Sequence, residues 1–313
     1  MSALPLTAPA PAKINLGLFV GPPRGDGRHE LVSAMQSISL ADELTLELAP
    51  EGTTHDEVVC PGVPGENLAA RALAAFRAAT SWDAPPLRLR IDKRIPVAAG
   101  LAGGSADAAA ALRLAAAAAG MPPDLPVGAG ARDALLLRLA AGLGADVPAQ
   151  IRPGRWLASG AGEVLEELPD PVTPIGVLVL PLAAELSTAA VYAEADRLAR
   201  LRAPAFLAER RRALHAAFDL GMSLPHDAGL LHNDLQAAAV SLCPAIVRAL
   251  GEARDAGAEP ALLSGSGPTV IGLFPRANGL AAAERAVAAL AGRSPAPLAA
   301  HTVGVDMGGV LCV

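Results

Sequence analysis

The feature that most constrains this chain is a glycine-rich segment between an expected strand and an expected helix. The segment PVAAGLAGGSADAAAALR covers residues 96–113, and we expect its alanine-rich helix to run to about Ala119. Glycines let backbone N–H groups approach a phosphate closely, and a helix N-terminus adds unpaired donors and partial positive charge. The glycine spacing fits neither the Walker A loop nor the dinucleotide fingerprint. The segment alone is therefore compatible with phosphate binding and with ordinary helix packing.

A second segment, PAKINLGL at residues 11–18, places two polar residues on an otherwise apolar strand. Lys13 and Asn15 are two positions apart, so their side chains lie on the same face. A buried lysine without a partner is costly, and this face should therefore meet an anion or a carboxylate. Of the 25 basic residues only Lys13 and Lys93 are lysines, which suggests positions where arginine cannot substitute, although chance can also explain so small a number.

The third segment, GLGADVP at residues 142–148, places Asp146 just beyond an expected helix at residues 132–142. Taken alone, Asp146 reads most simply as a turn or cap residue. Near the end of the chain, SGSGPT at residues 264–269 similarly reads as a turn between two strands.

The remaining pattern alternates strands and helices without an internal repeat, which predicts an α+β protein of two lobes. Strands are expected near residues 12–20, 31–40, 44–48, 87–91, 175–180 and 301–305, and helices near 66–79, 188–201 and 280–291, with at least two more between 205 and 250. We divide the chain into residues 1–160 and 161–313.

Composition excludes several classes of protein. The chain is 52% hydrophobic and 18% charged, which rules out wholesale disorder, and a net charge of −6 argues against nucleic acid as a partner. No apolar run approaches the roughly 18–20 residues of a membrane span, and the N-terminus lacks the features of a secretory signal. Three scattered cysteines fit a reduced protein. We expect a cytoplasmic protein without a membrane partner.

Together, PAK-N, PxxxGLxGGSxDAA and SGSGPT resemble the three signatures of the GHMP kinase superfamily, in the same order. The strings PAKINLGLFVGPPRGDGRHEL, DEL at 42–44, ENLAARAL at 66–73, LGADVP and NDLQAAA resemble more narrowly its 4-diphosphocytidyl-2-C-methyl-D-erythritol kinases. The resemblance implies an ATP-binding N-terminal GHMP domain with a left-handed βαβ unit, followed by a ferredoxin-like substrate-binding domain. It also implies transfer of the ATP γ-phosphoryl group to the 2-hydroxyl of CDP-methylerythritol in non-mevalonate isoprenoid biosynthesis.

The resemblance assigns roles to individual residues. Asp146 becomes the base and Lys13 the cation that orients it. Mg²⁺ is expected with ATP, held mainly by phosphate oxygens, with Ser105 as the candidate protein ligand. The ATP site would comprise Pro96, Val97, Ala98, Ala99, Gly100, Leu101, Ala102, Gly103, Gly104, Ser105, Ala106, Asn67 and Leu68. The substrate site would comprise Asn15, Arg28, His29, Thr188, Tyr192, Gly265, Ser266 and Gly267.

Two departures from the family pattern concern the loop and the base pocket. Ala98, Ala99 and Ala102 stand where the family often has glycine, which restricts their φ angles. Arg28 replaces a tyrosine before His29, and we expect cytosine to stack between Tyr192 and the Arg28 guanidinium while His29 binds the base edge.

Two alternatives to this function remain open: a GHMP kinase for mevalonate, homoserine or a sugar, and a nucleotide-binding regulator without catalysis. The oligomeric state is expected to be a monomer or homodimer. His55, His215, His226, His232 and His301 show no ligand spacing, and Arg210–Arg212 read as a solvated helix face.

Overall fold

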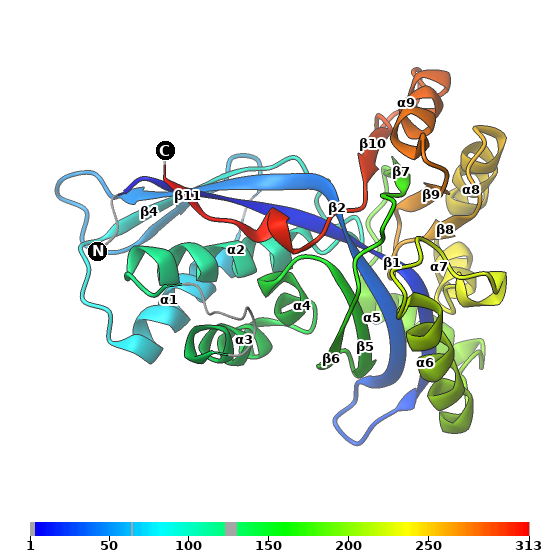
Figure 1. Ribbon diagram of the computed structural model, residues 1–313, viewed down its shortest axis with the longest axis horizontal. Helices are drawn as coiled ribbons and strands as arrows, with labels where there is room; N and C mark the ends of the chain where they lie inside the picture. Colours follow the sequence, from blue (N-terminus) through cyan, green and yellow to red (C-terminus); the bar gives the residue numbers. More distant parts are fainter. Residues whose placement is uncertain (1–3, 64, 123–129, 313) are drawn as a thin grey trace.

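A long β-hairpin connects the two halves of the molecule. The computed structural model describes residues 4–63, 65–122 and 130–312, and in it β1 (Leu6–Pro23) and β2 (His29–Leu48) pair antiparallel almost throughout. Figure 1 shows this hairpin running from the end that holds both chain termini to the opposite half. The apolar segments predicted as separate strands at 31–40 and 44–48 form the single strand β2.

The hairpin belongs to a seven-stranded mixed sheet. Five further strands complete this sheet, of which β3 pairs parallel with β4 and the other pairs are antiparallel: β3 (Glu57–Val59), β4 (Leu87–Asp92), β5 (Arg155–Gly160), β6 (Val164–Leu168) and β11 (Leu311–Cys312). The proposed boundary after residue 160 falls between β5 and β6, which pair with each other. The chain end also returns to this sheet, because β11 pairs with β1.

Four helices lie on one face of this sheet: α1 (Leu68–Thr80), α2 (Gly103–Ala118), α3 (Ala131–Leu143) and α4 (Val147–Ile151) (Figure 1). Helix α2 is the central one, and twelve of its sixteen residues are buried. Most of these are alanines, whose small side chains let α2 approach the sheet and α1 closely. The alanine-rich segment after the glycine loop thus becomes the core of the first half.

The second half contains a four-stranded antiparallel sheet in the order β10–β7–β9–β8. Its strands are β7 (Gly176–Leu180), β8 (Ala261–Leu263), β9 (Val270–Phe274) and β10 (Leu298–His301), and its helices are α5 (Thr188–Arg197), α6 (Pro204–Phe218), α7 (Gln236–Leu242), α8 (Ala245–Asp255) and α9 (Gly279–Ala289). With α8 and α9 as its crossing helices, this is the β-α-β-β-α-β order of a ferredoxin-like domain. The α+β class with a ferredoxin-like second half is therefore confirmed.

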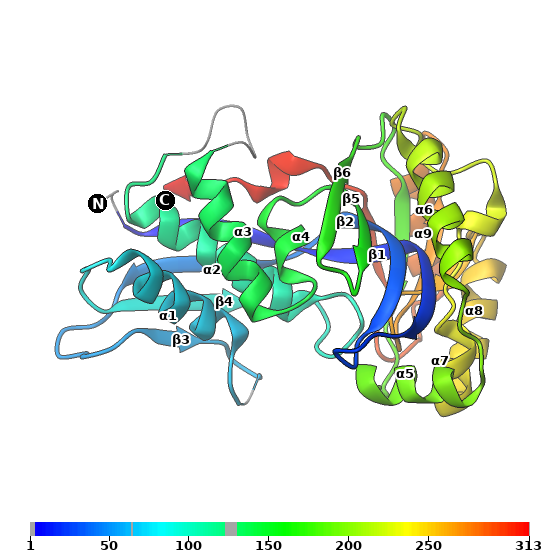
Figure 2. The ribbon, with the colours of Figure 1, turned by 90° about the horizontal axis from the view of Figure 1, so that it is seen from below.

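The turn end of the β1–β2 hairpin packs against the second half. Strand β1 lies beside α6 (Figure 2), and its Leu16 and Phe19 belong to the same buried cluster as Leu207 and Leu214 of α6. One consequence is that polar residues on β1 lie where the two halves meet. Among the described residues, no helix is long and apolar enough to cross a membrane.

Candidate active site

A cleft of about 1100 Å³ lies where the two halves meet. The glycine loop at residues 96–104, strand β1, the N-terminus of α4, helix α5 and the turn at residues 265–267 all contribute to its lining. Segments that are far apart in the sequence therefore form one continuous cavity, large enough for a nucleotide and a second small molecule.

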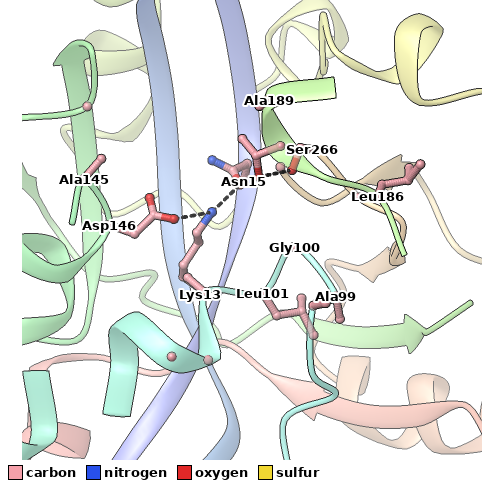
Figure 3. Close-up of a pocket in the computed structure, with 18 of the residues that line it drawn as sticks. Lys13, Asn15, Ala99, Gly100, Leu101, Ala145, Asp146, Leu186, Ala189 and Ser266 are labelled. Atoms are coloured by element: carbon pink, nitrogen blue, oxygen red, sulfur yellow. Dashed lines mark hydrogen bonds and ion pairs between the residues drawn. The ribbon is translucent and has the colours of Figure 1, made fainter. Parts of the chain in front are cut away.

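Lys13, Asn15 and Asp146 form a polar group in the middle of this cleft (Figure 3). The Lys13 ammonium donates a hydrogen bond to Asn15 Oδ1 at 2.9 Å, and its Nζ lies 3.6 Å from Asp146 Oδ2. Asn15 Nδ2 in turn donates to Ser33 Oγ on β2 at 2.7 Å. The Lys13 side chain is 9% exposed and that of Asp146 is 41% exposed. A nearly buried cation thus holds a carboxylate that a ligand can still reach.

The conformation of Asp146 does not support a capping role. Asp146 occupies the N-cap position of the short helix α4, but its side chain makes no capping hydrogen bond. Its carboxylate is directed toward Lys13 instead (Figure 3). Because capping requires the side-chain oxygen to accept from the first-turn N–H groups, the cap interpretation of Asp146 is wrong, although the residue does lie in the turn that precedes α4.

The glycine loop is held against the turn at residues 264–267. Gly100 has a φ of +75°, and a Cβ atom placed on it would lie 2.6 Å from the Ser264 carbonyl oxygen, so this close approach requires glycine. Ser264 Oγ also donates to the Gly100 carbonyl at 3.2 Å. Ala98 and Ala102 adopt φ values of 54° and 55°. Alanines therefore hold left-handed conformations in this loop, each at a cost of about 1–2 kcal/mol.

Below the glycine loop lies a buried charged cluster, Asp42, Lys93 and Asp107, that we had not predicted as part of the site. Lys93 Nζ pairs with Asp42 and, at 2.8 Å, with Asp107 on α2. The Asp42 carboxylate also accepts the backbone N–H groups of Arg94 and Ile95. The cluster thus fixes the segment that leads into the loop. Its signs in the sequence are Lys93, one of the two lysines of the chain, and Asp107, a carboxylate in an alanine-rich helix.

The cluster predicts a particular pH dependence of stability. Burial raises the pKa of Asp107 to about 7, while Lys93 opposes this rise and Asp42 reinforces it. Between about pH 4 and pH 7 the Asp107 carboxyl is ionised in the unfolded protein but protonated in the folded protein. The stability that this carboxyl contributes at low pH is therefore lost as the pH rises toward 7. The free energy of unfolding of Asp107→Asn, relative to that of the wild type, should therefore rise by about 2–3 kcal/mol between pH 5 and pH 8.

Urea unfolding of both proteins at the two pH values measures this difference. Groups remote from Asp107 titrate equally in both proteins and cancel in the comparison. If the two proteins differ in free energy of unfolding by the same amount at pH 5 and at pH 8, Asp107 is ionised at both pH values.

At the far end of the cleft, β2 meets α5. The rings of His29 and Tyr192 lie 4.9 Å apart at an angle of 41°, and His29 Nε2 lies 2.8 Å from Asp196 Oδ1. Burial, reinforced by the charge of Asp146, raises the pKa of Tyr192 to about 12, so its phenol is neutral. Thr188 Oγ1 lies 3.0 Å from Ser266 Oγ, which joins α5 to the 264–267 turn. Arg28 is half exposed, and its guanidinium pairs with Asp26.

The structure brings nearly all the predicted site residues to this one cleft. Those in its lining are Lys13, Asn15, Arg28, His29, Asn67, Leu68, Pro96, Val97, Ala98, Ala99, Gly100, Leu101, Ala102, Gly103, Gly104, Asp146, Thr188, Tyr192, Gly265, Ser266 and Gly267. Ser105 and Ala106 are not in the lining. Asn67 caps α1 through its Oδ1, which accepts the Ala69 N–H at 2.8 Å. The lining also includes Lys93, Asp107 and Asp196.

The remaining candidates lie outside the cleft. His215 pairs with Glu166 and His232 with Asp234, while Arg210 and Arg211 pair with Glu209 and Glu166. Within residues 4–63, 65–122 and 130–312, no group of three histidine, cysteine or acidic side chains is placed to hold a metal ion.

Comparisons with known proteins agree over most of the chain. The family model for the GHMP kinases N terminal domain matches residues 67–154, and that for the GHMP kinases C terminal matches residues 208–293. A 4-diphosphocytidyl-2-C-methyl-D-erythritol kinase of Anaeromyxobacter dehalogenans is 42% identical over 91% of this chain and 85% of its own length. A protein of the same name from Streptomyces coelicolor is 43% identical over 84% of this chain and 86% of its own.

Solved structures give the same picture. The crystal structure of a 4-(cytidine 5'-diphospho)-2C-methyl-D-erythritol kinase superposes with a TM-score of 0.73 at 33% identity, covering 95% of this chain and 99% of its own. A homoserine kinase from Cytophaga hutchinsonii superposes with a TM-score of 0.72 at 16% identity, covering 99% of this chain and 98% of its own. The second match shows the fold alone.

Proposed function

Because this chain belongs to the GHMP kinases, and among them to the 4-diphosphocytidyl-2-C-methyl-D-erythritol kinases, we propose that its cleft transfers the γ-phosphoryl group of ATP to the 2-hydroxyl of that substrate in isoprenoid precursor biosynthesis. The single observation that carries the proposal is the Lys13–Asp146 pair, which lies beside the glycine loop in the middle of the cleft. A nucleotide-binding protein without catalysis has no need to keep a carboxylate accessible beside a buried cation.

The proposed reaction follows from the positions of these groups. Asp146 accepts the proton of the tertiary hydroxyl, whose oxygen forms a bond to the γ-phosphorus as the bond to the bridging oxygen of ADP breaks. Lys13 orients Asp146 and stabilises the negative charge that develops on the transferring group. Positioning and electrostatic stabilisation of this kind supply most of the acceleration in phosphoryl transfer.

ATP is proposed to lie along the glycine loop, with its phosphates near the N-terminus of α2. A Cβ atom on Gly104 would meet no other atom within 4 Å, so the backbone there is open to a ligand. Asn67 and Leu68 would border the adenine. Residues 1–160 would thus supply most of the ATP-binding and catalytic groups. Residues 161–313 would supply helix α5 and the turn at residues 265–267, which complete the substrate site.

Mg²⁺ is proposed to accompany ATP. This ion usually binds through phosphate oxygens, water and one or two protein ligands. The Ser105 hydroxyl, in the first turn of α2, is the protein ligand we propose. When bound, the ion offsets the charge of the phosphates. A cytoplasmic location and a monomeric or homodimeric state stay predictions.

One assay separates the proposed reaction from that of related kinases. ADP release is measured with CDP-methylerythritol, mevalonate and homoserine as acceptors in parallel reactions. We expect turnover with CDP-methylerythritol alone. Turnover with mevalonate or homoserine would assign the chain a different acceptor, and nucleotide binding without ADP release for any acceptor would favour a regulator.

Tyr192→Ala tests the base end of the cleft. Stacking of a base on an aromatic ring is worth on the order of 1–3 kcal/mol, so we expect the KM for the cytidylyl substrate to rise roughly ten- to a hundredfold. The KM for ATP should stay unchanged, because the ATP loop lies at the other end. Equal loss for both substrates, or a lower melting temperature with unchanged KM values, would reduce Tyr192 to a packing residue.

A further inference from the structure

Asp196 lies at the base end of the cleft, one helical turn after Tyr192 on α5, and nothing in the sequence had pointed to it. Its Oδ1 atom lies 2.8 Å from Nε2 of His29 on β2. The His29 side chain is 8% exposed and that of Asp196 is 43% exposed. Among the described residues, no hydrogen bond to His29 Nδ1 is formed. The contact therefore engages one ring nitrogen of a residue that lines the cleft and leaves the other ring nitrogen unengaged.

This contact decides where His29 carries its hydrogen. An ionised carboxylate only accepts hydrogen bonds, so the ring nitrogen that faces it must be the one with the N–H group. In a neutral imidazole the other nitrogen then has no hydrogen and acts as an acceptor. Asp196 thus makes Nε2 the donor and Nδ1 the acceptor, and the packing of the ring against Tyr192 limits its rotation.

We infer that Asp196 is a positioning residue that fixes this His29 tautomer and so makes the cleft select cytosine over uracil. The inference rests on the proposed function. Cytosine carries an amino group at position 4, which can donate a hydrogen bond to an unprotonated Nδ1. Uracil carries a carbonyl oxygen at the same position, so two acceptors would face each other. A site that pairs a buried polar group rejects a ligand that leaves it unpaired far more strongly than a purely apolar pocket does.

Asp196→Asn tests the inference because it keeps the shape and replaces an acceptor-only carboxylate by an amide that can also donate. The amide nitrogen of Asn can donate to Nε2, which stabilises the tautomer with hydrogen on Nδ1. The measurement is kcat/KM at pH 8.5 for the cytidine substrate and for its uridine diphosphate analogue, at saturating ATP. We expect the ratio of cytidine to uridine kcat/KM to fall at least about tenfold in Asp196→Asn, with the KM for ATP unchanged.

The matched control is Glu194→Gln on the same helix. Glu194 pairs with Arg197 and Ser241 and does not line the cleft, so this variant should keep the wild-type ratio. Asp196→Glu, which restores a carboxylate, should recover part of the selectivity. An unchanged ratio in a folded Asp196→Asn enzyme overturns the inference.

A spectroscopic measurement keeps the inference testable even if Asp196→Asn folds poorly. Nitrogen-15 NMR of the wild-type histidine side chains, with the His29 signals assigned by their loss in His29→Gln, reports which ring nitrogen is protonated. We expect hydrogen on Nε2 alone at pH 8.5, and hydrogen on Nδ1 overturns the inference. Failure of the proposed function is distinct, because wild-type enzyme would then not phosphorylate the cytidine substrate at all.

Discussion

Asp146→Asn is expected to lower turnover at least about a hundredfold while ATP binding remains nearly intact. The amide keeps the size of the carboxylate but cannot accept the proton of the attacking hydroxyl. Asp146 makes no capping hydrogen bond in α4, so its loss should leave the fold in place. Its carboxylate lies 3.6 Å from Lys13 Nζ, so it contacts the cation and does not accept from the first-turn N–H groups of α4.

Single-turnover kinetics with saturating ATP and substrate measure the chemical step, and a fluorescent ATP analogue measures nucleotide binding. Asp219→Asn is the matched control, since Asp219 is the C-cap residue that follows α6 and lies outside the cleft. It should keep wild-type turnover. Near-wild-type turnover of Asp146→Asn would show that Asp146 is not the base.

Lys13→Arg is expected to be the second severe change, with kcat lowered by about 10²–10³, the usual scale for one lost electrostatic contact to a transition state. The charge is kept, but the guanidinium is a planar fork and not a compact ammonium. Space is limited, because Asn15 Oδ1 lies 2.9 Å from Lys13 Nζ and a Cβ atom on Gly265 would lie 3.6 Å from it. A larger head group must displace Asn15, the turn or Asp146.

Lys93→Arg provides the matched control because it is the same substitution at the other lysine of the chain. Lys93 pairs with Asp42 and Asp107 below the loop and does not contact Asp146. Its substitution should change stability or the KM for ATP while kcat stays within about tenfold of the wild type. Retained kcat in Lys13→Arg would remove the argument that this position requires lysine.

Local patterns in the sequence predicted much of the secondary structure. Period-two alternation located β4, and helical spacing located α1 and α9, because these periods depend only on how a strand or helix exposes its faces. The strand expected at 301–305 was placed too late, since β10 ends at His301. The short elements β3, β5, β6, β11 and α4 were not predicted. A few residues carry too little periodicity to identify such elements.

The same reasoning identified most of the residues in the cleft, with help from the resemblance to the GHMP kinases. Lys13 could be singled out because a lone lysine on an apolar strand requires a partner. Asp146 could not be assigned from its surroundings alone, because an aspartate before Val-Pro resembles an ordinary turn. Only the family resemblance gave it a chemical role.

The sequence by itself determined the strand with Lys13 and Asn15, the glycine loop and the alanine-rich helix, because each depends on residues close together in the chain. Only the tertiary structure decided which charged groups meet. It brought Asp146 to Lys13, Lys93 to Asp42 and Asp107, and Asp196 to His29. Such pairs join groups that lie 14 to 167 positions apart along the chain. Their distances depend on how the halves pack, and no local pattern of residues encodes that packing.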